Sequence, residues 1–170
     1  FRTDRFSIEK KRDKSPVTEA DKETESVVRR LILDQFPGDA VIGEEMGNVS
    51  GNTDYEWIVD PIDGTKSFIS GVPLYSTLVG MTCRGEPTIG VIAIPALREI
   101  VIAAKGLGAW YGTVDLQNNP LPMTRAQVSK QASLEDGLLV TSQADNFSRR
   151  NASSAYSKLE SMAYVTRTWG

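Results

Sequence analysis

Two carboxylates on either side of a proline are the residues of this chain best suited to bind a metal ion. In Asp60-Pro61-Ile62-Asp63 the proline ring fixes the backbone angle φ between the two acids, so the turn is rigid. The turn presents the side-chain oxygens of Asp60 and Asp63 together with the carbonyl oxygen of Ile62. Because Mg²⁺ prefers oxygen ligands in a near-octahedral arrangement, this segment predicts a Mg²⁺ site built from those oxygens.

Gly64 and Thr65 follow the second carboxylate and begin what the sequence predicts to be a short helix. The first N–H groups of a helix lack partners within the helix, and the helix dipole favours an anion there. A phosphate group beside a metal pair is the simplest ligand for this arrangement. Asp, Pro and Gly are also ordinary turn residues, so a surface turn is the alternative. The apolar, strand-like run 57–59 before them and the threonine after them favour a site.

Two further acidic segments precede this turn. Asp21 comes three residues after Thr18, which gives a helix start that resembles a capping box. From this segment alone, an acid favoured by the helix dipole is the preferred explanation of Asp21. Glu44 and Glu45 follow the short apolar strand 41–43, and in an extended chain their side chains point to opposite sides. One of them would then face a site and the other would face solvent.

The composition excludes several classes of function. The 170 residues are 40% hydrophobic and 24% charged with a net charge of −3, which fits one globular domain without a basic surface for nucleic acid or membrane. There are no histidines, so catalysis of the Ser-His-Asp and Cys-His types is excluded. No apolar run approaches the length of a membrane span. The single cysteine, Cys83, excludes an internal disulfide and indicates a reducing compartment, here the cytoplasm.

The longest predicted element is a helix that begins at Thr18 and ends at Phe36-Pro37-Gly38. An amphipathic spacing is kept by Ala20, Val27, Val28, Leu31 and Ile32. We expect residues 1–16 to be a charged, solvated lead-in to this helix.

The other predicted elements are mostly short strands. Strands are predicted at 74–83, 88–94, 99–104, 137–141 and 164–168, and a further short strand is predicted after the turn 106–110. Loops are predicted at 47–54 and 112–133, and a helix is predicted at 151–162. Short connections indicate an antiparallel meander. The chain, residues 1–170, is predicted to be one layered α+β unit.

Three segments resemble the N-terminal hallmarks of the inositol monophosphatase superfamily of Mg²⁺-dependent, Li⁺-sensitive phosphatases. They are Val17-Thr18-Glu19-Ala20-Asp21, Gly43-Glu44-Glu45 and Trp57-Ile58-Val59-Asp60-Pro61-Ile62-Asp63-Gly64-Thr65, in the order of the family. The resemblance extends to Gly90-Val91-Ile92 and Gly106-Leu107-Gly108-Ala109-Trp110, and so spans nearly the whole chain. It implies a layered α/β sandwich of the sugar-phosphatase type with a mostly antiparallel sheet, and a homodimer is common in the family.

By that resemblance, Glu44, Asp60 and the carbonyl of Ile62 would bind a first metal ion, and Asp60 would bridge to a second one held by Asp63. One ion would lower the pKa of a water and the other would steady the leaving oxygen. The resemblance thus agrees with the cofactor, Mg²⁺, that the oxygen donors predict.

The resemblance also implies the catalytic residues and the phosphate contacts. Thr65, with Asp21 behind it, would orient and deprotonate the attacking water near Glu44. The phosphate and the substrate would be held by Asp63, Gly64, Thr65 and Lys66. Phosphoryl transfer requires the protein mainly to position the reactants and to neutralise charge.

One departure from the family concerns its C-terminal half, which supplies a further metal ligand in a Trp-Asp-x-Ala-x-Gly type motif. The chain begins at Phe1 and stops after Trp169-Gly170, so we expect a fragment in which this half is missing. On that expectation the metal site lacks the ligand from the C-terminal half, and a targeting segment before Phe1 would not be part of the sequence.

Within the superfamily, the histidinol-phosphate phosphatase branch is the most similar. The resemblance rests on Asp63-Gly64-Thr65-Lys66-Ser67-Phe68, Gly71-Val72-Pro73-Leu74-Tyr75-Ser76-Thr77-Leu78 and Arg167-Thr168-Trp169-Gly170. It implies that the small phosphorylated substrate is histidinol phosphate, in histidine biosynthesis. Inositol-1-phosphatases and 3′-phosphoadenosine 5′-phosphate phosphatases share the core motif and stay open as alternatives.

Other phosphatase chemistries fail on spacing. A haloacid-dehalogenase site needs an aspartate where Pro61 stands, a cysteine phosphatase needs an arginine where Ile89 stands, and a Walker A loop needs a glycine where Thr65 stands. The alternative from another class is a metal- or phosphate-binding regulator descended from such a phosphatase. A regulator of this kind predicts the loss of a water-activating residue, and Asp21, Glu44 and Thr65 are all present, which favours the enzyme.

Overall fold

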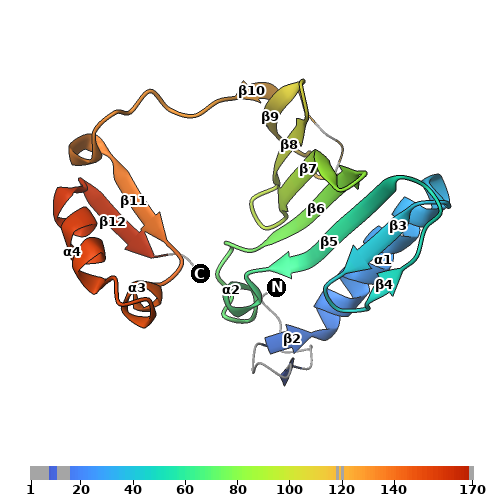
Figure 1. Ribbon diagram of the computed structural model, residues 1–170, viewed down its shortest axis with the longest axis horizontal. Helices are drawn as coiled ribbons and strands as arrows, with labels where there is room; N and C mark the ends of the chain where they lie inside the picture. Colours follow the sequence, from blue (N-terminus) through green and yellow to red (C-terminus); the bar gives the residue numbers. More distant parts are fainter. Residues whose placement is uncertain (1–7, 11–15, 118, 120, 169–170) are drawn as a thin grey trace. The chain divides into compact units, whose positions relative to one another are not determined.

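The chain divides into two compact units, residues 1–126 and residues 127–170. The computed structural model describes residues 8–10, 16–117, 119 and 121–168, and of residues 8–10, 16 and 17 it describes only the backbone. The first unit (Figure 1) contains β1 (Ile8–Lys10), β2 (Pro16–Thr18), α1 (Glu19–Gln35), β3 (Ala40–Gly43), β4 (Asn48–Val49), β5 (Tyr55–Asp63), α2 (Thr65–Ile69), β6 (Ser76–Cys83), β7 (Glu86–Ile94), β8 (Glu99–Ala104), β9 (Gly108–Thr113) and β10 (Thr124–Ala126).

An eight-stranded sheet dominates this unit, with the strand order β10-β9-β8-β7-β6-β5-β3-β4. From β5 to β10 each strand pairs antiparallel with the next, which confirms the predicted meander and the α+β class. Only the pair β3–β5 of this sheet is parallel, with Gly43 opposite Val59. Because parallel strands run in the same direction, the C-terminal ends of β3 and β5 meet at one edge of the sheet.

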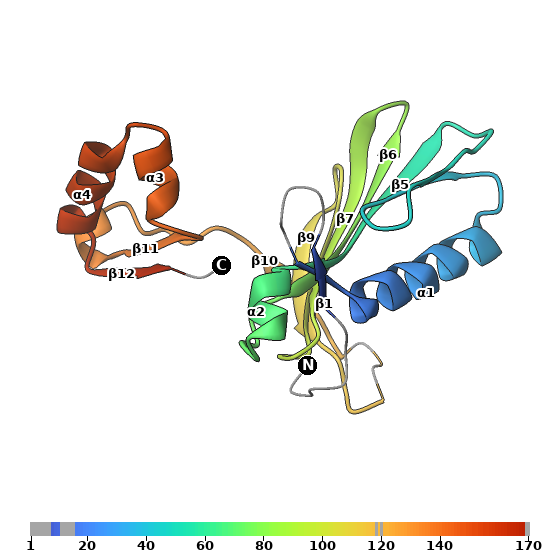
Figure 2. The same cartoon turned by 90° about the horizontal axis from the view of Figure 1, so that it is seen from below.

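Helix α1 packs against β3 and β5 on one face of the sheet (Figures 1 and 2). The core beneath the helix contains the buried residues Ile32, Val41 and Val59, with Val28, Leu33, Val49, Trp57 and Val79 packed against them. Burial of these side chains is the main stabilising contribution to this packing.

The helix face that meets the sheet differs from the predicted one. Val27 and Leu31 are 45% and 57% exposed, so their assignment to the apolar face is wrong. The buried positions of α1 are Asp21, Glu25 and Ile32. They are spaced by four and seven residues, which places them on one side of a helix. Two acids therefore lie on the face that packs inward.

Several short strands lie in segments predicted to be irregular. β4 lies in the predicted loop 47–54 and β10 in the predicted loop 112–133, and each pairs with the strand beside it. β1 lies in the predicted lead-in, residues 1–16, and pairs antiparallel with β2, which begins at the last residue of that segment. Residues 1–7 and 11–15 of the lead-in lie outside the described residues. Strands of two or three residues depend on hydrogen bonds to a neighbour rather than on local pattern, which is why the sequence does not reveal them.

The second unit contains η1 (Leu134–Asp136), β11 (Leu138–Thr141), α3 (Asp145–Arg149), α4 (Ser153–Met162) and β12 (Val165–Thr168). β11 and β12 pair in parallel, and the rings of Phe147 and Tyr156 pack 4.9 Å apart between α3 and α4. The predicted strands and the predicted helix of this region are confirmed, whereas α3 was not predicted. None of the helices in the described part of the chain is long and apolar enough to span a membrane.

Candidate active site

The end of β5 is irregular where the two predicted metal-binding acids lie. The pairing with β6 is regular up to Asp60, and the next paired residue is Asp63, opposite Ser76. Between these two pairs β5 has one residue more than β6, which makes a β-bulge. Pro61 suits this place because it has no N–H for the ladder, and its carbonyl accepts a hydrogen bond from Thr77 Oγ1 at 2.9 Å. Because a bulge re-aims side chains, it suits two acids that serve one site.

Gly64 turns the chain from β5 into α2. Its φ of 86° and ψ of 40° lie in the left-handed region, which residues with a side chain rarely adopt. A Cβ at this position would also lie 3.2 Å from the carbonyl oxygen of Leu74. The backbone therefore requires glycine here, and the predicted helix start after it is confirmed, because α2 begins at Thr65.

The side chains of α2 divide between the site and the interior. Thr65 Oγ1 donates to the carbonyl of Ile62 at 3.2 Å, and a carbonyl oxygen with two lone pairs keeps a second acceptor position. The side chain of Lys66 is exposed. Phe68 is buried and meets Tyr75 edge-on, with ring centroids 5.0 Å apart, and burial raises the pKa of the Tyr75 hydroxyl. This aromatic contact anchors the short helix.

Glu44 reaches the same edge through the parallel pairing of β3 with β5. Its backbone N–H donates to the carbonyl of Val59, next to Asp60, at 3.2 Å. Glu44 is exposed and Glu45 is half-buried, but both lie in a bend rather than in an extended chain, so strand alternation does not separate them. The backbone N–H of Glu45 instead donates to the carboxylate of Glu25 on α1, at 2.6 Å.

Asp21 is buried at the start of α1, with 1% of its surface exposed. One of its carboxylate oxygens accepts hydrogen bonds from the backbone N–H and the hydroxyl of Thr18, at 2.7 and 2.6 Å. β2 ends at Thr18 and packs against α2, which brings the start of α1 near α2. The structure does not join Asp21 to Thr65 directly, since the Thr65 hydroxyl donates to Ile62.

Strand pairing thus brings Glu44, Asp60 and Asp63 to one edge of the sheet, but their carboxylates do not converge. In the part of the chain that the structure describes, no three side chains of the types His, Cys, Asp or Glu form a group that could hold a metal ion. The donors fit Mg²⁺ by their chemistry, because every predicted ligand is an oxygen and two of these carboxylates are exposed. Metal binding would require these side chains to come together.

Three residues that hold this edge were not predicted as part of the site: Glu25, Ser76 and Thr77. Ser76 Oγ donates to Asp63 Oδ2 at 3.4 Å, and the neighbouring hydroxyl of Thr77 binds the bulge. Two adjacent hydroxyl residues at the start of an apolar strand were the available signal. Glu25 stands one helical turn after Asp21, so two acids on one helix face could have indicated it.

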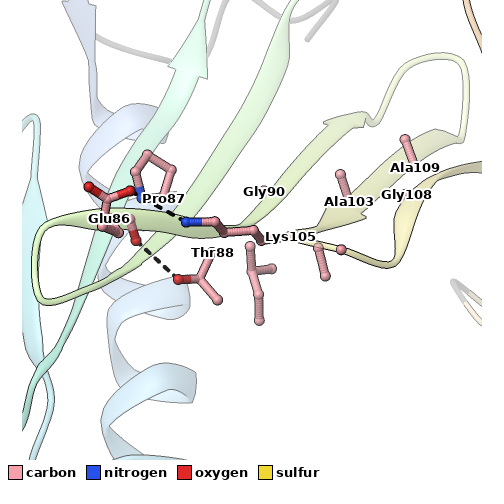
Figure 3. Close-up of a pocket in the computed structure, with 11 residues that line it drawn as sticks. Glu86, Pro87, Thr88, Gly90, Ala103, Lys105, Gly108 and Ala109 are labelled. Carbon is pink, nitrogen blue, oxygen red and sulfur yellow. Dashed lines mark hydrogen bonds and ion pairs between the residues drawn. The ribbon is translucent and has the colours of Figure 1, made fainter.

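A surface hollow of about 690 Å³ lies at the opposite end of the sheet (Figure 3). Glu86 begins β7 at the end where β5 begins, whereas the candidate acids lie where β5 ends. We call these the Glu86 end and the Asp60 end. The polar groups of the hollow are engaged with each other, since Lys105 Nζ lies 3.4 Å from Glu86 Oε2 and the Thr88 hydroxyl donates to the Glu86 carbonyl at 3.0 Å. The hollow is therefore separate from the candidate active site.

Comparisons with known proteins agree with this fold. The sequence model of the inositol monophosphatase family matches residues 1–168. A histidinol-phosphatase from Mycobacterium tuberculosis is 38% identical over 163 residues, which are 96% of this chain and 61% of that protein. A fructose-1,6-bisphosphatase/inositol-1-monophosphatase from Aquifex aeolicus is 39% identical over 104 residues, 61% of this chain and 39% of that protein.

The solved structure of an inositol monophosphatase from Thermotoga maritima shares the fold. It superposes with a TM-score of 0.77 at 31% identity, over 96% of this chain and 59% of that chain. The present chain thus spans about 60% of the length of this structure and of the Mycobacterium tuberculosis relative.

Proposed function

The chain belongs to the inositol monophosphatase family, and from this premise we propose that it is the metal- and phosphate-binding part of a Mg²⁺-dependent phosphomonoesterase. The observation that carries the proposal is the arrangement at the Asp60 end. There, Glu44 follows β3, Asp60 and Asp63 flank a bulge of the adjacent β5, and α2 starts directly afterwards. Oxygen donors beside a helix start suit a metal-bound phosphate.

The proposed metal ligands are Glu44, Asp60, Asp63 and the carbonyl of Ile62. When bound, Mg²⁺ would lower the pKa of a water and neutralise charge that develops on the phosphate and the leaving oxygen. The chain holds the ligand backbones in place through the β3–β5 pairing and the bulge. Prior placement of the ligands reduces the reorganisation that the reaction requires.

Thr65 and Asp21 are the proposed residues for the attacking water. The Thr65 hydroxyl already lies beside a proposed ligand, 3.2 Å from the Ile62 carbonyl, and would orient the water and pass its proton towards Asp21. The backbone N–H groups of Gly64 and Thr65 would hold the phosphate oxygens, with Asp63 beside them. The exposed ammonium of Lys66 would add positive charge for the phosphorylated substrate.

For the substrate we propose histidinol phosphate, as a step of histidine biosynthesis. The support is the relative from Mycobacterium tuberculosis, which is named histidinol-phosphatase and matches 96% of this chain. An inositol phosphate is the second candidate, because the Aquifex aeolicus relative is named for inositol-1-monophosphatase. A cytoplasmic location and a homodimer stay predictions.

The substrate proposal is tested by phosphate release from histidinol phosphate, inositol 1-phosphate and 3′-phosphoadenosine 5′-phosphate. The full-length protein that contains this chain would be assayed with and without Mg²⁺. We expect Mg²⁺-dependent release with a preference for histidinol phosphate. A preference for another phosphate would keep the chemistry and overturn the substrate. No release from any of the three would support the regulator instead.

The site proposal is tested by the substitution Asp63→Asn. This change keeps the size of the side chain but removes a charged ligand, so we expect turnover to be abolished while the far-ultraviolet circular dichroism stays that of the parent. Asp54→Asn, the same change on an exposed acid at the Glu86 end, should leave turnover unchanged. If Asp63→Asn were as active as the parent, the metal assignment would be wrong.

A further inference from the structure

Glu25 is a fully buried acid that the mechanism above does not use. It lies in α1, its relative exposure is 0%, and the side chain of its partner Arg29 is 11% exposed. Both face the segment that connects β3 to β4 and that carries Glu44. We define residues 43–47, from the last residue of β3 to the residue before β4, as the Glu44 turn.

The carboxylate of Glu25 and the guanidinium of Arg29 together bind the Glu44 turn. Glu25 accepts hydrogen bonds from the backbone N–H groups of Glu45 at 2.6 Å and Met46 at 3.0 Å. Arg29 Nη2 donates to Glu25 Oε1 at 2.6 Å and also to the carbonyl of Gly47 at 2.5 Å. The residues directly after Glu44 are therefore held by charge-assisted hydrogen bonds, which are about twice as strong as neutral ones.

The start of the turn is fitted to the same pair. A Cβ built at Gly43 would overlap both the Glu25 carboxylate and the Arg29 guanidinium. On its other side the turn is tied to β5 by the hydrogen bond from the Glu44 N–H to the Val59 carbonyl. The backbone around Glu44 is thus fixed from the helix and from the sheet.

Stability alone is a poor explanation for this arrangement. A buried ion pair loses its hydration, and well-packed apolar residues of the same volume are often at least as stabilising. Arg29 Nε is also buried without a hydrogen-bond partner in the described part of the chain, which makes the pair more costly still. Directed hydrogen bonds to two backbone N–H groups and one carbonyl are what an apolar pair could not supply.

We propose that Glu25 and Arg29 are positioning residues, which hold the Glu44 turn so that Glu44 binds the metal ion at the Asp60 end. This inference rests on the proposed function, because it takes Glu44 as a metal ligand. Groups that orient metal ligands typically change metal affinity by about 10- to 100-fold when they are removed. The inference therefore predicts an effect on Mg²⁺ affinity and not only on folding.

The test is Glu25→Gln, which keeps the volume of the side chain but removes the charge that two N–H groups and Arg29 share. The readout is the rise in unfolding temperature of the substrate-free, full-length protein as Mg²⁺ is added. We expect the variant to need about tenfold more Mg²⁺ for half of the full rise, and to regain most of its turnover at saturating Mg²⁺. Glu86→Gln, the same change on an exposed acid, should behave as the parent.

A second readout follows the turn itself. In the metal-free protein, amide hydrogen exchange at Glu45 and Met46 should become faster in Glu25→Gln and stay unchanged in Glu86→Gln. A Glu25→Gln protein that unfolds at lower temperature but keeps the Mg²⁺ dependence of the parent would show a purely structural role and overturn the inference. If Glu25→Gln does not fold, Arg29→Lys replaces it, because lysine keeps the positive charge. This variant should need several-fold more Mg²⁺ for half of the full rise in unfolding temperature. An unchanged Mg²⁺ dependence would overturn the inference.

Asp63→Asn separates this inference from the proposed function. If Asp63→Asn abolishes the Mg²⁺-dependent rise and Glu25→Gln leaves it at the parent concentration, only the positioning role is wrong. If Asp63→Asn itself responds to Mg²⁺ as the parent does, the metal site is wrong and the positioning role is overturned with it.

Discussion

The two ends of the eight-stranded sheet use ion pairs of the same chemical type in different ways. At the Asp60 end, Glu25 and Arg29 lie 2.6 Å apart with side chains that are 0% and 11% exposed. At the Glu86 end, Glu86 and Lys105 lie 3.4 Å apart with side chains that are 73% and 66% exposed. The buried pair binds backbone groups of a turn, whereas the exposed pair contacts mainly solvent. Burial and backbone partners, rather than the presence of charge, distinguish the pair that can control geometry.

The same contrast extends to uncharged residues, so the chain offers matched sites at its two ends. In each pair the first residue lies at the Asp60 end and the second at the Glu86 end. Gly43 and Gly90 are glycines within strands, and Gly64 and Gly106 are glycines with positive φ. Thr77 and Thr88 each donate a hydroxyl hydrogen bond to a backbone carbonyl. Each pair allows one substitution to be compared at both ends.

The largest difference is expected between Gly43→Ala and Gly90→Ala. The first places a methyl group on the buried Glu25–Arg29 pair and should cost about 3–5 kcal/mol, the cost of breaking such a pair. In the second, the new Cβ meets no atom within 4 Å among the described residues other than its chain neighbours. This variant should be neutral or slightly stabilising, because alanine loses less entropy than glycine in a strand. The free energies of unfolding in urea measure both, and equal costs would refute the contrast.

A smaller difference is expected between Gly64→Ala and Gly106→Ala. Both residues have positive φ, 86° and 79°, so both variants should lose about 1–2 kcal/mol from backbone strain. Only Gly64→Ala also brings a Cβ to 3.2 Å from a carbonyl oxygen, that of Leu74. Urea unfolding should therefore show a larger loss for Gly64→Ala, and turnover should fall only there. A larger loss at Gly106 would mean that the contact with Leu74 does not matter.

The third comparison is Thr77→Val against Thr88→Val, which removes a hydroxyl and keeps the shape. Thr77 donates to the carbonyl of the buried Pro61 at the bulge, and losing that bond should cost about 1 kcal/mol. Thr88 donates to the carbonyl of the exposed Glu86, where water replaces the hydroxyl, so a smaller loss is expected. Thermal unfolding measures both changes, and a larger loss for Thr88→Val would contradict the prediction.

The smallest effect is expected for Glu86→Gln. Exposed ion pairs contribute little, so this variant should lose less than about 0.5 kcal/mol, and the loss should vanish at high salt, which screens exposed charges. The loss caused by Glu25→Gln should be nearly independent of salt because that pair is buried. Unfolding in low and in high sodium chloride gives both dependences. A salt-sensitive loss for Glu25→Gln would show that solvent reaches the pair.

The chemistry of the site, which stays a prediction, was proposed from the sequence alone because it depends on residue types at short spacing. Asp60 and Asp63 around a proline, with glycine next, indicate metal and phosphate binding without knowledge of the fold. The meander was predictable for the same reason, since strands and their turns alternate over a few residues. Glu44 was predicted as a metal ligand, and the parallel pairing of β3 with β5 explains how it comes to lie beside Asp60.

The supports of the site were not predicted, because their local signals are weak and their roles arise from pairing between distant segments. The bulge exists only in the register of β5 against β6, and neither strand shows it alone. Glu25 was missed because an amphipathic pattern assigns acids to solvent. That assumption also led to the wrong inward placement of Val27 and Leu31, since the apolar residues of α1 fit more than one helix face.

The hydrogen bonds of the Glu44 turn also bear on the order of folding. They join residues only 18 to 21 positions apart, from Glu25 and Arg29 to Glu45, Met46 and Gly47. Contacts of short sequence separation close small loops, which lose little entropy and form quickly. The bonds of the Glu44 turn involve no residue after Val59, so we expect this turn to form without waiting for β8 and β9, whose hairpins also close locally. A chain that emerges from the ribosome with its N-terminus first would then build the Glu44 side of the candidate active site before most of the sheet has been synthesised.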